Sequence, residues 1–380
     1  MPKLKGDMGN NRKRLSHAER LDWLRLYRSE NVGPVTFFRL IEQFGSAGGA
    51  LDALPALARR GGRKKPITIC SKAEAEREMD RIEATGGVMI ASIEPDFPAS
   101  LHGLDTAPLL IALGNPHLLS RPAIAIVGAR NASAAGRRMA ELLTRDLGAS
   151  GLLIVSGLAR GIDTAAHEAA LPTGTVAVMA GGVDVVYPPE NIGLYRRIRD
   201  EGCILSEMPP GTQPQAAHFP RRNRLISGCA LGVVVIEATL RSGSLITARF
   251  ALEQGRDVFA VPGSPLDSRS QGPNGLIRQG AILTENADDV LGAIQEQGQR
   301  LLTEPDPYDF RPSPAPIPDE RTLAISREKL LQSLGPTPVT VDEIIRQCQL
   351  SPSIVSLNLL ELELAGRIER HPGHRVSLIY

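Results

Sequence analysis

The sequence predicts an α/β protein: a Rossmann-like, doubly wound and mostly parallel sheet, preceded by a small helical domain and followed by a winged-helix domain. From about Leu109 onward, short apolar runs alternate with amphipathic segments, which is typical of βαβ units. Helical spacing of apolar residues precedes this region, and six prolines between positions 305 and 318 follow it. A chain of 380 residues is also long enough for two or three domains.

Composition and cysteine spacing predict a cytoplasmic protein with no metal or cofactor. Lysine and arginine (43) nearly balance aspartate and glutamate (42), so a site for a polyanion has to come from local clustering. The four cysteines lie far apart and show no CxxC spacing, which indicates a reducing compartment and excludes a zinc ribbon. The first residues lack the apolar core of a signal peptide, and no apolar run approaches the roughly 18 residues of a membrane span. We therefore expect no membrane contact.

The first hundred residues are expected to form a disordered basic tail, residues 1–14, and a helical domain, residues 15–100. The tail has no apolar periodicity, and a DNA-attracting arm is the alternative interpretation. Within the helical domain, Gly33 and Pro34 predict a turn between two helices, which resembles a SAM or helix-hairpin-helix domain. The amides of such a turn can hold a phosphate, but a purely structural hairpin fits the sequence equally well.

The central domain is expected over residues 105–297. Its predicted strands are AIAIVG, LLIVSG, TVAVMA, CILS, GVVVIEA, DVFAVPG and AILT. A parallel sheet places its ligand at the carboxyl ends of the strands, where loops enter helices and free N–H groups can meet an anion. Ligand-binding residues are therefore expected at these strand exits.

The first two strand exits combine glycines with guanidinium and hydroxyl groups that suit a phosphate. These candidates are Gly128, Arg130 and Ser133 after the first strand, and Gly157, Arg160 and Gly161 after the second. Neither exit carries GxGxxG, and the second strand ends in Ser156 where a nicotinamide site needs Asp or Glu, so NAD binding is not expected. His167 has no Ser, Cys or metal-ligand partner at a suggestive spacing and is interpreted as a packed histidine.

Two later helix starts supply most of the remaining candidates for phosphate binding. They are Arg221, Arg222, Asn223 and Arg224 of HFPRRNRLISG, Arg241, Ser242, Gly243, Ser244 and Thr247 of ATLRSGSLITARFA, and Asn274 of QGPNGLIRQGA. Three guanidinium groups at one helix start repel one another unless an anion neutralises them. Small residues at a helix start can bind a phosphate through backbone N–H groups. The alternatives are a solvated face for the arginines and a structural helix cap for the serines.

Residues 298–322 are expected to form a proline-rich linker, and residues 323–380 a winged helix. The third helix of this domain, residues 352–365, contains Glu361 and Glu363 but no Lys or Arg. A winged helix that reads bases usually presents basic or amide side chains there. Contact with protein is therefore favoured over base reading, although Arg367, Arg370 and Arg375 leave a phosphate contact open.

Eight segments in this order resemble the DNA-processing protein A family, also called the Smf family. They are VGAR (127–130), SGLARGID (156–163), GGVDVVYPPEN (181–191), SEMPPG (206–211), FPRRNRLISG (219–228), SGSLITA (242–248), GRDVFAVPG (255–263) and QGPNGLI (271–277). The resemblance implies a homodimer, formed through the Rossmann-like domain, that binds and protects incoming single-stranded DNA. It also implies loading of a RecA-type recombinase during natural transformation and recombination. Cys229 and Ala230 stand where the family pattern has Leu and Ser, which affects only local packing.

The resemblance also indicates which motif residues line the strand groove. These are Gly128 and Arg130, Gly157 and Arg160, Arg221 to Arg224, and Ser242 to Ser244. Aromatic residues make up only 4% of the chain, so a continuous stacking platform is not expected. Binding should then rest on phosphate contacts, depend on salt and be independent of sequence.

An enzyme and a transcription regulator are the two alternatives. Related phosphoribohydrolases carry a PGGxGTxxE signature with a catalytic glutamate, but Phe250 stands at that position here. No Ser/His/Asp, paired-carboxylate or metal constellation appears elsewhere, so we expect no catalysis. The acidic third helix argues against a regulator that reads bases through its winged helix.

Overall fold

The structure, a computed structural model, describes residues 14–104, 107–303, 320–371 and 373–379. The chain divides into two compact units, one of residues 1–15 and 76–305, the other of residues 16–75 and 306–380. The predicted basic tail, apart from its last residue, lies outside the described residues. Residues 304–319 of the predicted linker also lie outside the described residues. The first six positions of that linker, residues 298–303, continue a helix instead.

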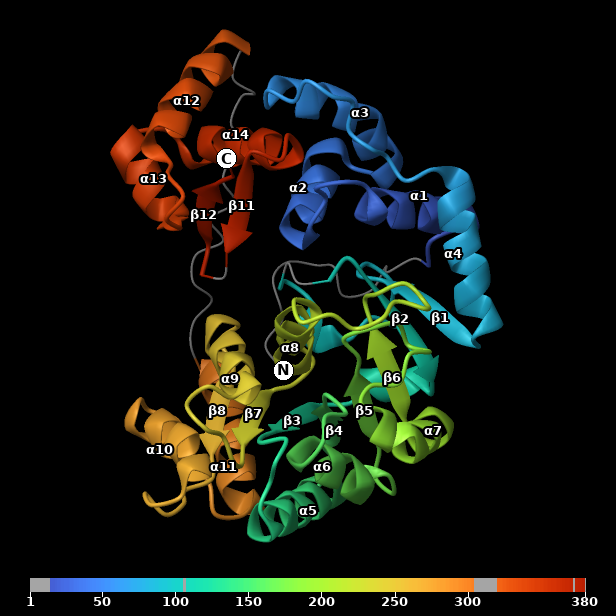
Figure 1. Ribbon diagram of the computed structural model, residues 1–380, viewed down its shortest axis with the longest axis vertical. Helices are drawn as coiled ribbons and strands as arrows, with labels where there is room; N and C mark the ends of the chain where they lie inside the picture. The colour runs from blue at the N-terminus through green and yellow to red at the C-terminus, as the bar shows by residue number, and fades with distance from the viewer. Residues whose placement is uncertain (1–13, 105–106, 304–319, 372, 380) are drawn as a thin grey trace. The chain divides into compact units, whose positions relative to one another are not determined.

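The first unit is built around a nine-stranded sheet with the strand order β1-β2-β6-β5-β4-β3-β7-β8-β9 (Figure 1). The strands are β1 (Gly87–Ala91), β2 (Leu109–Gly114), β3 (Ala123–Val127), β4 (Leu153–Ser156), β5 (Thr175–Val178), β6 (Cys203–Ser206), β7 (Gly232–Val235), β8 (Asp257–Ala260) and β9 (Ile282–Leu283). β2 pairs antiparallel with β1 and β6, and the other neighbours are parallel. The seven predicted apolar runs form β3 to β9, which confirms the Rossmann-like, mostly parallel sheet.

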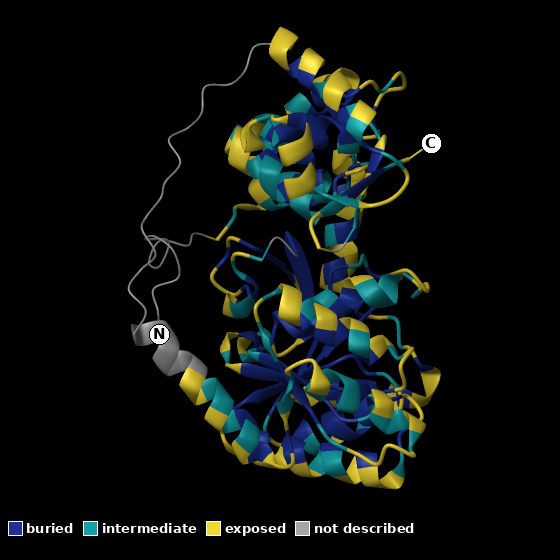
Figure 2. Cartoon of the chain, turned by 90° about the vertical axis from the view of Figure 1, so that its left-hand side faces the viewer, coloured by how far each residue is buried: buried dark blue, intermediate teal, exposed yellow. Residues whose placement is uncertain are grey.

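Helices cover both faces of this sheet. They are α5 (Ala134–Ala149), α6 (Ile162–Ala170), α7 (Ile192–Glu201), α8 (His218–Gly228), α9 (Gly243–Glu253), α10 (Gln271–Arg278) and α11 (Ala287–Thr303). Ile124 and Ile126 of β3 face a core shared with α5, α6 and α11, whereas Ala125 and Val127 face a core shared with α8 and α9. Figure 2 shows the strands as a buried layer inside helices whose outer faces are exposed. Burial on both faces explains why the strands read as continuous apolar runs.

The sheet begins earlier in the chain than the sequence analysis expected. Residues 87–91 fall in the predicted helical domain, yet they form β1 and pair with β2. Gly86, at a φ of +77°, follows helix α4 (Lys72–Ala84) and reverses the chain into the strand. Met89 and Ile90 are then buried, so the short run GVMIA behaves as an additional strand of the sheet.

The second unit combines the helical domain near the start of the chain with the winged helix at its end. Its elements are α1 (His17–Arg28), α2 (Pro34–Phe44), α3 (Ala47–Arg60), α12 (Glu320–Ser333), β10 (Val339–Thr340), α13 (Val341–Cys348), α14 (Pro352–Leu364), β11 (Ile368–His371) and β12 (Arg375–Leu378). Gly33 caps α2 and Pro34 is its first residue, as the predicted turn requires. Three helices followed by a strand ribbon confirm the winged helix. In the described part of the chain, no helix is long and apolar enough to span a membrane.

Candidate functional site

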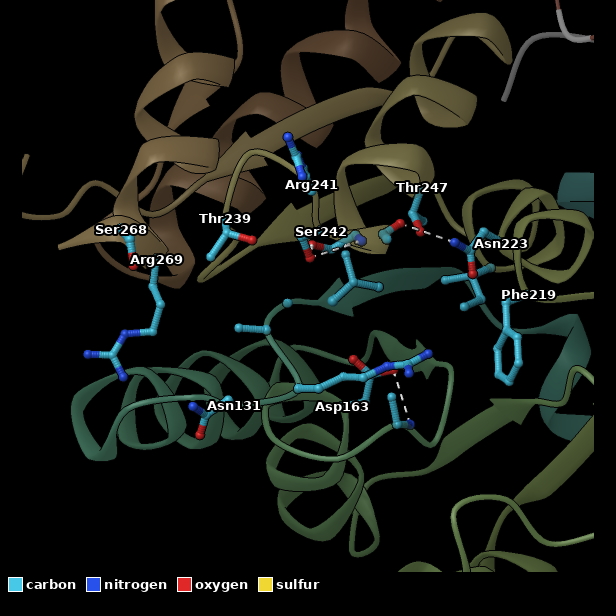
Figure 3. A pocket seen from close by; sticks show the side chains of 18 of the residues that line it. Asn131, Asp163, Phe219, Asn223, Thr239, Arg241, Ser242, Thr247, Ser268 and Arg269 are labelled. Atoms are coloured by element: carbon cyan, nitrogen blue, oxygen red, sulfur yellow. Dashed lines mark hydrogen bonds between the residues drawn. The ribbon is translucent and has the colours of Figure 1, made fainter. Parts of the chain in front are cut away.

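The main pocket of the sheet domain opens at the carboxyl ends of β3 and β7. From β3 the chain builds the sheet in one direction through β4, β5 and β6, and from β7 it builds the other side. Loops diverge at such a reversal of strand order and leave a crevice where α/β proteins bind ligands. The cavity here has a volume of about 710 Å³ and is lined by the loops after β3, β7 and β8 together with α8 and the start of α9 (Figure 3).

Arg222 is a buried cation on the floor of this pocket. Its side chain projects from α8, and its Nη1 donates to the carbonyls of Gly157 at 2.6 Å and Val178 at 2.5 Å. Burial lowers the pKa of Arg222 to about 10, which leaves it charged at neutral pH. A Cβ at Gly157 would collide with the Arg222 guanidinium, so the glycine predicted there serves this close approach. Arg222 therefore ties α8 to the ends of β4 and β5.

Asp163 and His167 of α6 complete a buried polar cluster below Arg222. The Asp163 carboxylate accepts hydrogen bonds from the amides of Gly157 and Ala159. Burial raises the pKa of Asp163, while Arg222 and these amides oppose the rise. His167 is fully buried between the Thr175 hydroxyl and the Leu158 amide, and burial lowers its pKa to about 3. His167 is thus a packed histidine, as the sequence predicted, and its low pKa keeps it neutral at neutral pH.

An exposed arginine lies against aromatic rings at the edge of the pocket, where Arg130 and Phe219 also line a smaller hollow together with Tyr187. The Arg130 guanidinium lies 5.4 Å from the centre of the Phe219 ring, and the rings of Phe219 and Tyr187 are 5.5 Å apart. Tyr187 is 43% exposed. Although aromatic residues are scarce in the chain, the fold brings two of them to one wall together with a cation, an arrangement that suits a planar, electron-rich group.

The opposite wall is formed by the start of α9 and the loop before it. The Ser242 hydroxyl caps α9 and is 2.7 Å from the Ser244 hydroxyl, while the Asn223 amide donates to the carbonyl of Gly243. Arg241 is exposed beside this helix start. The cap is uncharged and the first turn of a helix is electropositive, so this wall favours an anion.

A second helix start at the same sheet edge already holds an anion from the protein itself. The Glu237 carboxylate accepts from the amide of Ser133 at 2.9 Å and from its hydroxyl at 2.6 Å. A Cβ at Gly136, in the first turn of α5, would lie 2.5 Å from the Glu237 carboxyl carbon. Glu237 therefore fills the N-terminus of α5, and Ser133 is engaged there as its cap.

The structure brings together most, but not all, of the residues predicted to bind phosphate. Gly128, Arg130, Arg222, Asn223, Ser242, Gly243, Ser244 and Thr247 line the main pocket, and Gly157 and Arg160 line a smaller hollow beside it. Ser133, Gly161, Arg221, Arg224 and Asn274 are outside both linings. Arg224 pairs with Glu207, Asn274 bonds Gly263, and Arg221 is exposed. Gly161 has a φ of +79° at the start of α6.

Several lining residues were not among the sequence-based candidates. They are Asn131, Asp163, Phe219, Thr239, Asp267, Ser268 and Arg269. Arg269 comes from the loop after β8 and is paired with Asp267 at 2.9 Å. The available signal was position alone, because these residues follow strand exits that the sequence analysis had already identified.

Comparisons with known proteins agree with this architecture. The model of the DNA recombination-mediator protein A family matches residues 88–295. Models of a DprA-like N-terminal HHH domain and of a DprA winged helix domain match residues 17–80 and 312–374. Protein Smf of Escherichia coli is 40% identical over 285 residues, which are 74% of this chain and 74% of that protein.

Two solved structures share the fold over long stretches. The X-ray structure of DNA processing protein A from Streptococcus pneumoniae has a TM-score of 0.59 and 36% identity, covering 74% of this chain and 98% of that one. DNA processing protein A from Helicobacter pylori, whose structure concerns its single-stranded DNA binding mode, has a TM-score of 0.51 and 29% identity, covering 56% of this chain and 96% of that one. This chain belongs to the DNA processing protein A (DprA/Smf) family.

Proposed function

We propose that the pocket between β3 and β7 binds single-stranded DNA through its phosphates and carries out no reaction on it. The observation that carries this proposal is the charge of the lining. Four arginines, Arg130, Arg222, Arg241 and Arg269, face one cavity that contains only two carboxylates, Asp163 and Asp267. Together with the start of α9, this lining attracts a polyanion although the whole chain has a net charge of only +1.

One wall of the pocket suits the phosphates of a single strand, and the other suits its bases. Arg241 and the Ser242 cap offer donors to phosphate oxygens. Phe219, and Tyr187 in the smaller hollow beside it, offer ring faces on which one unpaired base can stack. Stacking tolerates every base, and phosphate contacts carry no sequence information. Binding is therefore expected to be salt-dependent and independent of sequence. A duplex, whose bases are already stacked, gains nothing from the aromatic wall.

The carboxylates of the pocket are engaged in structure, which supports a binding role over a catalytic one. Asp163 holds the amides of Gly157 and Ala159, and Asp267 holds the guanidinium of Arg269. Neither is placed as a free general base. Phe250, on α9, replaces the carboxylate that the related phosphoribohydrolases would use.

The partners that we propose are those that the family resemblance implies. We propose that the chain is a homodimer, formed through the Rossmann-like domain, that acts in the cytoplasm on incoming single strands and loads a RecA-type recombinase during natural transformation. Exposed leucines at 240, 252 and 266 leave apolar surface on this domain that a subunit contact would cover. Light scattering at micromolar concentration tests the dimer against the 40.8 kDa mass of one chain. Recombinase ATPase activity on strands precoated with a single-strand-binding protein tests the loading.

The direct test is a fluorescence-anisotropy titration with matched single- and double-stranded oligonucleotides at two salt concentrations. A preference for the single strand that weakens with salt is the expected result. Equal affinity for unrelated sequences is expected as well. No binding, or equal binding of duplex and single strand, would contradict the proposal.

A further inference from the structure

The third helix of the winged helix, α14, buries more apolar side chains than it contributes to the core of its own domain. Val355, Leu359 and Leu362 face the core of the winged helix itself. Leu360 and Leu364 are also buried, but they are not part of that core. Apolar side chains that are buried outside the core of their own domain must be covered by another element. The second face of α14 therefore requires a partner outside its own domain.

The partner in the structure is the helical domain at the other end of the same chain. α14 contacts α2 and α3 within the second unit. The Asn31 amide, in the turn before α2, donates to the carbonyl of Leu364 at 3.2 Å. Gly61, at the end of α3, approaches so closely that an added Cβ would collide with the carbonyl oxygen of Glu361 and lie 2.8 Å from the Cβ of Ala365. The backbones of α3 and α14 are therefore in direct contact at Gly61, with no side chain between them.

A buried carboxylate fixes the contact. Glu361 is fully buried, and it pairs with Arg327 of α12 in its own domain and with Arg60 of α3, whose Nε lies 2.9 Å from Glu361 Oε1. A carboxylate with no exposed surface is costly unless cations compensate it. Arg60 supplies one of the two compensating charges, so the charge of Glu361 is best compensated when α3 and α14 are together. This pairing also gives the acidic third helix a structural purpose.

Both elements of this unit that resemble DNA-binding parts are occupied by the contact. α14 corresponds to the helix that winged helices insert into a major groove, and here it faces α3. At the helix-hairpin-helix turn, an added Cβ on Gly33 would lie 3.9 Å from a carboxylate oxygen of Glu363. That carboxylate is paired with Arg370 of β11 at 2.7 Å, so an ion pair of the winged helix lies beside this turn.

We propose that α14 is a docking helix whose partner is the α2–α3 region of the same chain, so that the two terminal domains form one clasped module. The clasp withdraws α14 and the Gly33 turn from DNA. It is independent of the pocket between β3 and β7.

Cleavage of the full-length protein tests the clasp directly. A protease recognition sequence inserted after Pro312 allows the folded chain to be cut, and gel filtration then shows whether the C-terminal piece stays with the rest. The wild-type pieces are expected to elute together. Separation of the wild-type pieces would overturn the proposal, and so would release of the C-terminal piece by excess duplex DNA.

Gly61→Gln is the sharpest variant, because only the docked partner excludes the new side chain. Gly61 has a φ of −65° and a ψ of −6°, a conformation that any residue adopts, so α3 itself is not strained. Cleaved Gly61→Gln should release the C-terminal piece, with at least a tenfold weaker association. The neighbouring Arg59→Gln, at an exposed position, is the matched control and should retain the piece.

Glu361→Gln and Arg60→Gln test the ion pair separately and should weaken the association in the same direction. The fluorescence of Trp23, which is buried in α1, reports whether the helical domain of each variant is folded. A folded Gly61→Gln protein whose cleaved pieces remain together as in the wild type would refute the clasp.

Discussion

Arg222 is expected to contribute more to the stability of the sheet domain than to the selection of DNA. Replacing it by methionine keeps much of the side-chain volume but removes the donor to the carbonyls of Gly157 and Val178. It also removes the positive charge that opposes the rise in the pKa of Asp163. A buried hydrogen-bonding group that loses its partner costs about 1–3 kcal/mol. Because two buried carbonyls lose a charged donor, we expect Arg222→Met to destabilise the sheet domain by about 2 kcal/mol or more.

The two units offer a built-in control for this measurement. Trp23 is the single tryptophan of the chain and lies in the second unit, whereas the nine-stranded sheet belongs to the first. In a guanidinium titration, Arg222→Met should shift the circular dichroism transition of the sheet domain and leave the Trp23 fluorescence transition unchanged. Arg222→Lys keeps a charge but loses the geometry that reaches two carbonyls. Its sheet-domain transition should therefore lie between those of the wild type and Arg222→Met. An unchanged sheet transition together with a large loss of oligonucleotide affinity would refute the structural role and make Arg222 a simple phosphate ligand.

Three further changes test other parts of the site. Arg241 is exposed, so Arg241→Ala should change the free energy of unfolding by no more than about 0.5 kcal/mol. It should also reduce the slope of log affinity against log salt by about 0.7, the contribution of one phosphate contact on a single strand. An unchanged slope in anisotropy titrations would exclude the contact. Glu237→Gln removes the charge from the start of α5 and should lower the melting temperature of the sheet domain without abolishing DNA binding; a complete loss of binding would contradict this assignment. His167 has a pKa of about 3 in the fold, against 6.5 when unfolded, so the unfolded chain binds the extra proton between these values. Stability from this group is therefore complete above pH 6.5 and falls by roughly 1.4 kcal/mol per pH unit below it, about 2 kcal/mol at pH 5. His167→Gln should remove this part of the acid sensitivity in unfolding titrations at pH 7 and pH 5, and an identical acid loss in both proteins would refute it.

Most strands of the sheet were predictable because the sequence pattern that marks a strand is local. Each run such as AIAIVG or GVVVIEA is apolar over its whole length, and burial on both faces of a parallel sheet demands this. The run GVMIA was not separated from the helical domain, because four or five apolar residues next to a helix do not by themselves distinguish a strand from a helix end.

The fates of neighbouring polar residues depended on distant partners and could not be predicted in the same way. Arg221, Arg222 and Arg224 share one motif, yet one is exposed, one binds two carbonyls and one pairs with Glu207. Successive residues of a helix point about 100° apart, so a cluster in sequence is not a cluster in space. Ser133 is likewise engaged by Glu237, which is 104 positions away.

The Glu237 carboxylate at the start of α5 also determines what this fold excludes. In Rossmann domains that carry dinucleotides, the pyrophosphate rests on the helix that follows the first parallel strand, which here is the helix after β3. An NAD or FAD molecule placed in that position would set its two negative phosphates against a carboxylate already bonded to the Ser133 amide. The repulsion, and the loss of the N–H donors to an internal ligand, would leave the cofactor without its usual anchor. Glu237 thus occupies the position at the start of α5 where a dinucleotide would place its phosphates. The start of α9 carries no such carboxylate, so it remains open to a different anion across the crevice.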